Sequence, residues 1–349
     1  MKNTKKLLII GHLVEGRFDG QQSKINDVKA AFEKNGFDIE ILNYGSLSLF
    51  SILSSSRKAI KRNKNILLMP GGKKALFLYT FLSGFFKNKN FYYLSIGGWV
   101  TDLMQRKSSR RKLKNLKKFK TIVLQNKKTL ETFQNYGFDN TLYIPTFSSR
   151  QPLSDEQFKQ SLINFESDQT FRFCFFARII EAKGIFEACR VVKRLVSEHY
   201  NVKLDIYGQI QDKTITSKFE ENLDDNIRYH GVIHDNVIET LSSYYCMLFP
   251  TYYKGEGMAH SILESFMGGL PVIATDWRFN SELIENNKTG FLIDVNDLEN
   301  NLYNQMVYVI KNKKQIGEMR HNCFFKSKQF NSDGVLKPFI DLVTVNNNL

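Results

Sequence analysis

Two glutamates eight positions apart, Glu256 and Glu264, stand in the stretch KGEGMAHSILESFMGGLPVIAT, residues 254–275. In one continuous helix, eight steps of 100° would leave the carboxylates about 80° apart around the axis and about 12 Å apart along it. The glycines on both sides of Glu256 instead indicate a tight loop, with a helix that begins near Ala259 or His260 and holds Glu264 in its second turn. The N-terminus of a helix would then lie between the two glutamates.

Such a helix start suits an anion, because its backbone N–H groups lack intrahelical acceptors and its dipole end is positive. A carboxylate on either side can accept hydrogen bonds from hydroxyl groups. The arrangement fits a sugar joined through phosphates to a ribose. Gly268 and Gly269 would end the helix, and Pro271 would turn the chain into a buried strand. The alternative is a surface helix with two solvated glutamates.

A second pair of charged residues follows a predicted strand in FRFCFFARIIEAKGIFEA, where Arg178 and Lys183 stand five positions apart. A guanidinium and an ammonium just beyond a strand end can neutralise a departing diphosphate, each charged hydrogen bond contributing about 1.5–3 kcal/mol. Such neutralisation helps an anionic group to leave. The alternative is a surface turn with two solvated cations.

The elements that must position these residues alternate between short strand-like runs and longer amphipathic segments, and the pattern restarts at FRFCFFARI. Strands that alternate with helices predict parallel sheets covered on both faces, and 349 residues suffice for two domains. We predict an α/β protein with Rossmann-like domains at 1–147 and 171–328, a linker at 148–170 and a closing helix at 329–349, whose docking partner the sequence leaves open. Ligands of such domains bind at the carboxyl ends of the strands, in the cleft between domains.

The segment 249–293, FPTYYKGEGMAHSILESFMGGLPVIATDWRFNSELIENNKTGFLI, resembles the donor-site signature of the retaining glycosyltransferases of family 4, which have the GT-B fold. The resemblance implies that Glu256 contacts the donor sugar, that Glu264 holds the ribose hydroxyls, and that Arg178 with Lys183 stabilises the leaving diphosphate. Residues that it places along the sugar, the pyrophosphate and the base are Gly257, Met258, Ala259, His260, Ser261, Gly208, Val232 and Ile233. His260 is read as a hydrogen-bonding residue at the helix start rather than as a catalytic base.

The N-terminal half resembles the family only in its general pattern. Gly16 lies in a loop after the first strand, where a phosphate-facing turn is expected. Gly97, Gly98 and Trp99 stand where many members place a histidine that touches the donor sugar. A bare backbone would approach a sugar closely there, and Trp99 would either stack on an acceptor ring or belong to the core.

Charge and cysteine content indicate the kind of partner and the cellular compartment to expect. The formal net charge is +14, which favours an anionic partner, although an ordinary lysine-rich surface also accounts for it. The four cysteines are widely spaced, so we expect a reducing cytoplasm and neither a disulfide framework nor a metal site. No familiar nucleic-acid-binding signature is found, and no nucleic-acid partner is expected.

A basic stretch at 106–120, RKSSRRKLKNLKKFK, has nine Lys or Arg residues and no acid. Leu113, Leu116 and Phe119 are spaced by three, which indicates a basic amphipathic helix that docks on an anionic membrane. The aromatic run at 75–86, flanked by lysines in the same domain, supports the same docking, although it is far shorter than the ~20 residues of a membrane span. A solvated basic face and a buried helix are the respective alternatives.

We therefore expect a cytoplasmic enzyme, peripheral on the inner face of the membrane, that moves a sugar from a nucleotide diphosphate, UDP being favoured, to a lipid-linked saccharide. The resemblance further implies retention of configuration and a role in cell-surface polysaccharide synthesis. No metal is expected, because the sequence has no D-x-D pair and because Arg178, Lys183 and the helix start would neutralise the diphosphate. Two alternatives stay open: a nucleotide-sugar epimerase on the same scaffold, and a non-catalytic protein that binds nucleotides or membranes.

Overall fold

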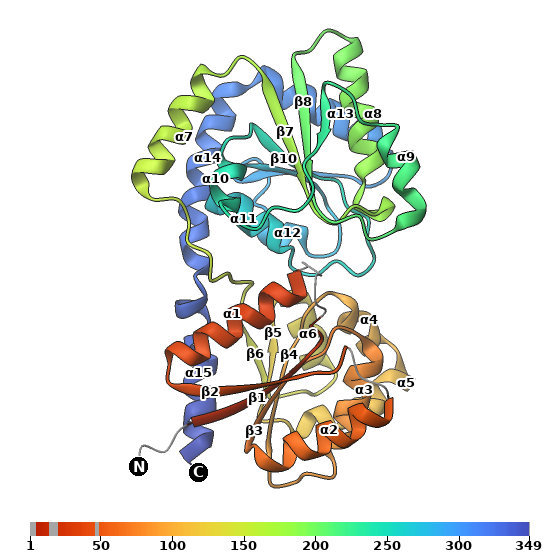
Figure 1. Cartoon of the computed structure of the whole chain (residues 1–349), viewed down its shortest axis with the longest axis vertical. Helices are drawn as coiled ribbons and strands as arrows, with labels where there is room; N and C mark the ends of the chain where they lie inside the picture. Colours follow the sequence, from red (N-terminus) through yellow and green to blue (C-terminus); the bar gives the residue numbers. More distant parts are fainter. Residues whose placement is uncertain (1–4, 14–19, 46–48, 349) are drawn as a thin grey trace. The chain divides into compact units, whose positions relative to one another are not determined.

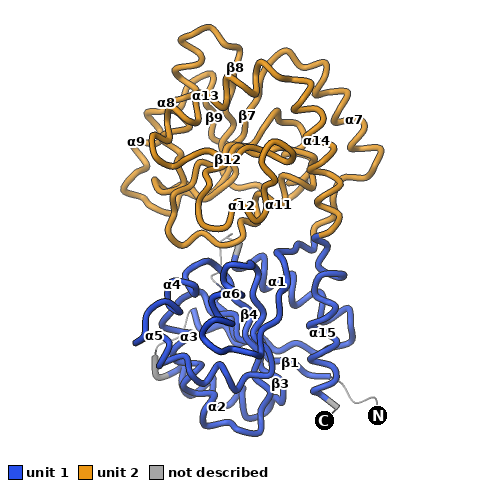
Figure 2. The backbone as a smooth tube through the Cα atoms, turned by 180° about the vertical axis from the view of Figure 1, so that it is seen from behind, with its two compact units in different colours: residues 1–149, 330–349 blue, residues 150–329 orange. Residues whose placement is uncertain are grey.

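The computed structural model describes residues 5–13, 20–45 and 49–348, which divide into two compact units (Figure 2). Unit 1 comprises 1–149 and 330–349, and unit 2 comprises 150–329. Each unit contains one six-stranded sheet whose paired strands are all parallel. The predicted α/β class with two Rossmann-like sheets is confirmed.

The sheet of unit 1 has the strand order β2-β1-β3-β4-β5-β6, with helices on both faces (Figure 1). Its central strands are buried on both sides, as in β3, NILLM, because helices cover both faces of a parallel sheet. The elements are β1 (Lys5–Gly11), α1 (Gly20–Lys34), β2 (Phe37–Asn43), α2 (Leu49–Arg62), β3 (Asn65–Met69), α3 (Lys73–Ser83), β4 (Asn90–Leu94), α4 (Trp99–Gln105), α5 (Lys107–Lys112), the 3₁₀ helix η1 (Lys114–Lys118), β5 (Thr121–Leu124), α6 (Lys127–Asn135), β6 (Thr141–Tyr143) and α15 (Ser332–Asn348).

The sheet of unit 2 has the order β12-β11-β10-β7-β8-β9, so that β7 lies in its middle between β10 and β8. Its elements are α7 (Asp155–Ser167), β7 (Phe171–Phe176), η2 (Glu181–Lys183), α8 (Ile185–Ser197), β8 (Val202–Tyr207), η3 (Lys213–Ile215), α9 (Thr216–Glu220), β9 (Ile227–Tyr229), α10 (Val237–Ser242), β10 (Cys246–Phe249), α11 (His260–Met267), β11 (Val272–Thr275), α12 (Asn280–Leu283), β12 (Gly290–Ile293), α13 (Leu298–Lys311) and α14 (Lys313–Ser327). A last 3₁₀ turn, η4 (Lys328–Phe330), precedes α15.

One segment differs from the sequence prediction, and a second has a docking partner that the sequence left open. Much of 148–170, predicted as a linker, is helix α7, which begins with a capping box between Ser154 and Gln157. The C-terminal helix α15 returns to unit 1, where Phe339 packs edge to face against Phe32 of α1. The chain therefore passes between the two units twice.

The prediction of one amphipathic helix at 106–120 is wrong. The segment is divided between α5 and η1, and Leu113, Leu116 and Phe119 are buried in the core of unit 1. A spacing of three matches the three residues per turn of a 3₁₀ helix as well as one side of an α-helix. These three apolar side chains are therefore not available to a membrane.

Candidate functional site

The residues singled out in the C-terminal half gather at one edge of the sheet of unit 2. Arg178 and Lys183 follow β7, and Glu256 lies in the loop after β10. Gly208 follows β8, while Val232 and Ile233 are half-buried in the loop after β9. Because β10, β7, β8 and β9 are parallel neighbours, their carboxyl ends lie at the same edge.

Lys183 and Glu256 form a buried ion pair at this edge. The Nζ atom of Lys183 lies 2.5 Å from Oε2 of Glu256, and the residues are only 5% and 7% exposed. The hydroxyl of Thr251 donates a second hydrogen bond of 2.9 Å to the same carboxylate oxygen. Burial lowers the pKa of Lys183, and the charge of Glu256 acts in the opposite direction. The pair therefore holds an ammonium group in a desolvated place where its geometry is fixed.

The loops after β7 and β10 can approach each other because Gly184 has no side chain. Its φ of +77° is left-handed, and a Cβ atom there would lie 2.2 Å from the carbonyl oxygen of Pro250. The amide of Tyr252 also donates to the carbonyl of Ala182 over 2.9 Å. This backbone contact sets the distance between the loop that carries Lys183 and the loop that carries Glu256.

Arg178 lies beside the same tyrosine ring, Tyr253, as Lys183. Its guanidinium lies 5.1 Å from the centre of the Tyr253 ring, and Nζ of Lys183 lies 5.7 Å from it. Arg178 is half-buried and donates from Nη1 to Oε1 of Gln211 over 3.0 Å. Its charge also helps to lower the pKa of Lys183, as expected for neighbouring cations. Two positive groups thus converge on one ring.

Helix α11 has the predicted start. It begins at His260 with Ala259 as N-cap, and Gly268 and Gly269 end it before β11. An alanine side chain cannot cap a helix, so it supplies no acceptor for the N–H groups of the first turn. Those groups and the positive end of the helix dipole make this turn suitable for an anion.

Glu264 stands in the second turn of α11, as predicted, and is 7% exposed. Its Oε1 atom lies 2.9 Å from Nε of Arg150 and 3.5 Å from Nδ1 of His260. Arg150 also donates weakly to the carbonyl oxygen of His234. The carboxylate is therefore held in place by a residue from the segment that enters unit 2.

The other predicted site residues lie either at the start of α11 or in unit 1. Gly257, Met258 and Ser261 flank the start of α11 and are half-buried. In unit 1, Gly97 has a φ of +81°, Gly98 is the N-cap of α4, and Trp99 packs partly against the core. Gly16 lies outside the described residues.

Sequence reasoning missed four contributors: Arg150, Thr251, Tyr253 and Trp277. Thr251 and Tyr253 lie inside the recognised segment, but their residue types alone do not show that they touch Glu256 and the two cations. Trp277 donates from Nε1 to the carbonyl oxygen of Tyr253 over 2.9 Å and so fixes that loop. Arg150 is 114 positions from its partner Glu264, and no local pattern signals such a contact.

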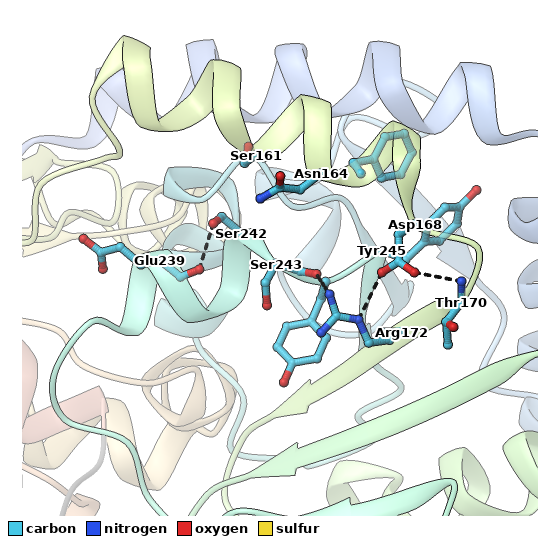
Figure 3. Close-up of a pocket in the computed structure, with 11 residues that line it drawn as sticks. Ser161, Asn164, Asp168, Thr170, Arg172, Glu239, Ser242, Ser243 and Tyr245 are labelled. Atoms are coloured by element: carbon cyan, nitrogen blue, oxygen red, sulfur yellow. Dashed lines mark hydrogen bonds and ion pairs between the residues drawn. The ribbon is translucent and has the colours of Figure 1, made fainter.

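A hollow of about 170 Å³ lies at the opposite edge of the same sheet (Figure 3). It is lined by α7, the start of β7 and the turn before β10. Its one cation, Arg172, is bonded to Asp168 over 3.2 Å and to the carbonyl oxygen of Ser243 over 3.0 Å (Figure 3). Among the described residues that line this hollow, none starts a helix and Arg172 has no second cation beside it, so the edge with Lys183 is the better candidate site.

No three His, Cys, Asp or Glu side chains within the described ranges are grouped so that they could hold a metal ion. In the same ranges, no helix is both long and apolar enough to cross a bilayer.

Comparison with known proteins identifies relatives of both the sequence and the fold. An uncharacterized glycosyltransferase of Methanocaldococcus jannaschii, MJ1059, is 29% identical over 160 residues, which are 44% of this chain and 38% of that protein. The capsular polysaccharide biosynthesis glycosyltransferase CapM of Staphylococcus aureus is 25% identical over 180 residues, 47% of this chain and 45% of that protein. The matches thus span less than half the length of these relatives.

Among solved structures, Anabaena HepE (Alr3699) in complex with UDP has a TM-score of 0.75 at 13% identity, covering 97% of this chain and all of that one. HepE has also been solved with UDP-glucose, with a TM-score of 0.74 at 14% identity over 99% of this chain and all of that chain. These likenesses show that the chain has the GT-B fold. The family model for glycosyl transferases group 1 matches residues 155–329, half of the chain. The chain belongs to the group 1 glycosyl transferases.

Proposed function

We propose that the protein transfers a sugar from a UDP-sugar to a hydroxyl group of a saccharide acceptor, with retention of configuration. The observation that carries the proposal is the convergence of Lys183, Arg178 and the uncapped start of α11 at one edge of unit 2. A buried lysine, a half-buried arginine and helix N–H groups together suit a diphosphate. The UDP and UDP-glucose complexes of HepE support the choice of uridine as the base.

In this proposal each side chain has a distinct task. Lys183 and Arg178 stabilise the negative charge that develops on the diphosphate as the bond between the sugar carbon and the phosphate oxygen breaks. Glu256 accepts hydrogen bonds from the sugar hydroxyls and holds Lys183 in place, and Glu264 accepts hydrogen bonds from the ribose. The new bond forms between the acceptor oxygen and the same sugar carbon, and the acceptor proton goes to the departing phosphate oxygen. No protein base is required.

The nature of the acceptor is a further part of the proposal. The likeness to CapM supports a role in cell-surface polysaccharide synthesis, with a lipid-linked saccharide as the acceptor. The acceptor would then be offered at the inner face of the membrane. Gly97, Gly98 and Trp99 are the residues of unit 1 that we assign to the acceptor side.

The test is a donor screen with purified protein, a panel of UDP- and GDP-sugars and a membrane extract, in which both sugar transfer and donor hydrolysis are measured. The proposal predicts transfer from at least one UDP-sugar that depends on the extract. Release of an altered sugar without any acceptor would indicate an epimerase instead. If neither transfer nor hydrolysis occurs with any donor, the protein is not the enzyme proposed.

A further inference from the structure

The end of helix α3 in unit 1 exposes two phenyl rings. Phe81 is 60% exposed and Phe85 is 69% exposed, and their rings pack edge to face with centroids 5.2 Å apart. The opposite side of the helix is buried through Leu76 and Tyr79. Because burial of apolar surface is favourable, two neighbouring phenyl rings in water are unfavourable unless another apolar surface covers them.

A lysine lies beside the preceding turn of the same helix. The Nζ atom of Lys112 in α5 lies 5.3 Å from the centre of the Phe77 ring, which stands one helical turn before Phe81. The side chain of Asn115 in η1 donates to the carbonyl oxygen of Thr80 over 3.2 Å, so η1 lies against the end of α3. We define the α3 patch as Phe77, Phe81 and Phe85 with the exposed residues Lys74, Lys87, Lys112 and Lys114.

The charge of the chain is concentrated around this patch. Between residues 41 and 130 there are 20 of the 49 basic residues and one of the 35 acidic ones, Asp102. That segment has a formal charge of +19, and the rest of the chain has −5. The segment includes α2, α3, α5 and η1, and α3 and α5 lie side by side in unit 1 (Figure 1). The net excess of positive charge therefore belongs to this segment of unit 1, and the other 29 basic residues are outnumbered by 34 acidic ones.

An anionic bilayer matches both the exposed phenyl rings and the lysines of the α3 patch. Aromatic rings enter the boundary between headgroups and acyl chains, and lysines reach the phosphates around them. Near such a surface each basic residue strengthens binding by about 1 kcal/mol, roughly fivefold. Phe81 and Phe85 pack against each other and form a joint apolar projection rather than two separate platforms for nucleobases.

We propose that the α3 patch docks this protein on an anionic lipid surface, with Phe81 and Phe85 inserted and the surrounding lysines on the headgroups. The inserted side chains are therefore those at the end of α3, in place of the buried Leu113, Leu116 and Phe119. The proposal is independent of the proposed reaction, since docking requires neither donor nor acceptor.

The experiment measures co-sedimentation with vesicles of phosphatidylcholine alone and of phosphatidylcholine mixed with phosphatidylglycerol. Wild type should bind the mixed vesicles and should be released by salt. Phe81→Ser with Phe85→Ser, and separately Lys112→Glu with Lys114→Glu, should each weaken binding by roughly tenfold or more. The matched control is Lys159→Glu with Ile163→Ser on α7 of unit 2, where Ile163 is also 60% exposed, and it should bind as wild type does.

Three outcomes would overturn the proposal. One is equal binding of wild type and both patch variants, and another is equal binding of wild type to both kinds of vesicle. The third is a partner other than lipid: either the wild type binds a single-stranded oligonucleotide more tightly than vesicles, or the Phe variant has a lower mass than wild type in light scattering without vesicles. Circular dichroism and thermal unfolding of the patch variants, measured in parallel, should match those of wild type, so that a loss of folding is detected separately.

Discussion

Lys183 in unit 2 and Lys112 in unit 1 are both lysines beside an aromatic ring, yet their surroundings differ in every other respect. The Nζ atom of Lys183 lies 4.9 Å from the Phe249 ring and is buried against Glu256. Lys112 lies 5.3 Å from the Phe77 ring and is exposed. A buried, paired cation has one position and suits a step in which a bond breaks. An exposed cation among many others attracts any anionic surface, and salt weakens this attraction.

Replacing the buried lysine should have the largest effect. Lys183→Met removes a charge from the diphosphate site, and we expect turnover to fall roughly 100-fold or more. It also leaves Glu256 buried without its counter-charge, which should reduce the free energy of unfolding by about 3–5 kcal/mol. Steady-state kinetics and urea denaturation measure the two effects.

Two further variants test whether burial explains the difference between Lys183 and Lys112. Lys183→Met combined with Glu256→Gln should recover much of the stability but none of the activity. Lys112→Met should change both quantities little, with a stability change within about 0.5 kcal/mol, as for an exposed residue. Equal losses in Lys183→Met and Lys112→Met would show that burial does not distinguish the two lysines.

Arg178→Ala should separate activity from stability. Arg178 is half-buried and bonded to a neutral amide, so its removal leaves no buried charge behind. Loss of one charged hydrogen bond to the leaving group should lower turnover about 10- to 100-fold, while the unfolding free energy changes by no more than about 1 kcal/mol. Unchanged turnover would remove Arg178 from the proposed mechanism.

Glu264→Gln should act on donor binding. The carboxylate is held by Arg150 and faces the proposed ribose position, so we expect the Kd for UDP to rise about tenfold through the loss of charge-assisted hydrogen bonds. Arg150→Met should raise the Kd for UDP by only about threefold, because Arg150 orients the carboxylate of Glu264 and does not itself contact UDP. Calorimetry measures both values. Glu239→Gln, an exposed glutamate beside the hollow at the other edge of the sheet, is the matched control and should bind UDP as wild type does.

The smallest effect concerns pH. Burial lowers the pKa of Lys183 below its ordinary 10.5, so between the lowered pKa and 10.5 the unfolded chain binds more protons at this residue than the folded chain. The cost of burying the ammonium is fully present below the lowered pKa and disappears as the pH approaches 10.5. The unfolding free energy of wild type minus that of Lys183→Met should therefore rise with pH in the alkaline range. A difference that falls, in urea titrations at successive pH values, would contradict this sign.

The two units also differ in how far their sequences predict their structures. In unit 2 the start and end of α11 follow from local signals, namely the glycines around Glu256 and the pair at 268 and 269, and the structure confirms them. The partners of the two glutamates depend on contacts between distant segments, such as Arg150 with Glu264, which no local pattern contains.

In unit 1 the spacing of Leu113, Leu116 and Phe119 correctly indicates one apolar side but not what that side faces. The core of unit 1 takes up these three residues, and the phenyl rings left in water are those at the end of α3. Hydrophobic periodicity identifies a side that will be covered, while the covering partner, whether core or membrane, depends on the tertiary packing. For this reason the spacing alone wrongly assigned Leu113, Leu116 and Phe119 to a membrane surface.

A crystal structure with bound UDP tests the central claim most directly. We expect the diphosphate within hydrogen-bonding distance of the backbone N–H groups at the start of α11 and of the side chains of Lys183 and Arg178, with the ribose hydroxyls on Glu264. UDP bound elsewhere, or bound at this edge with its phosphates directed away from Lys183 and the start of α11, would contradict it.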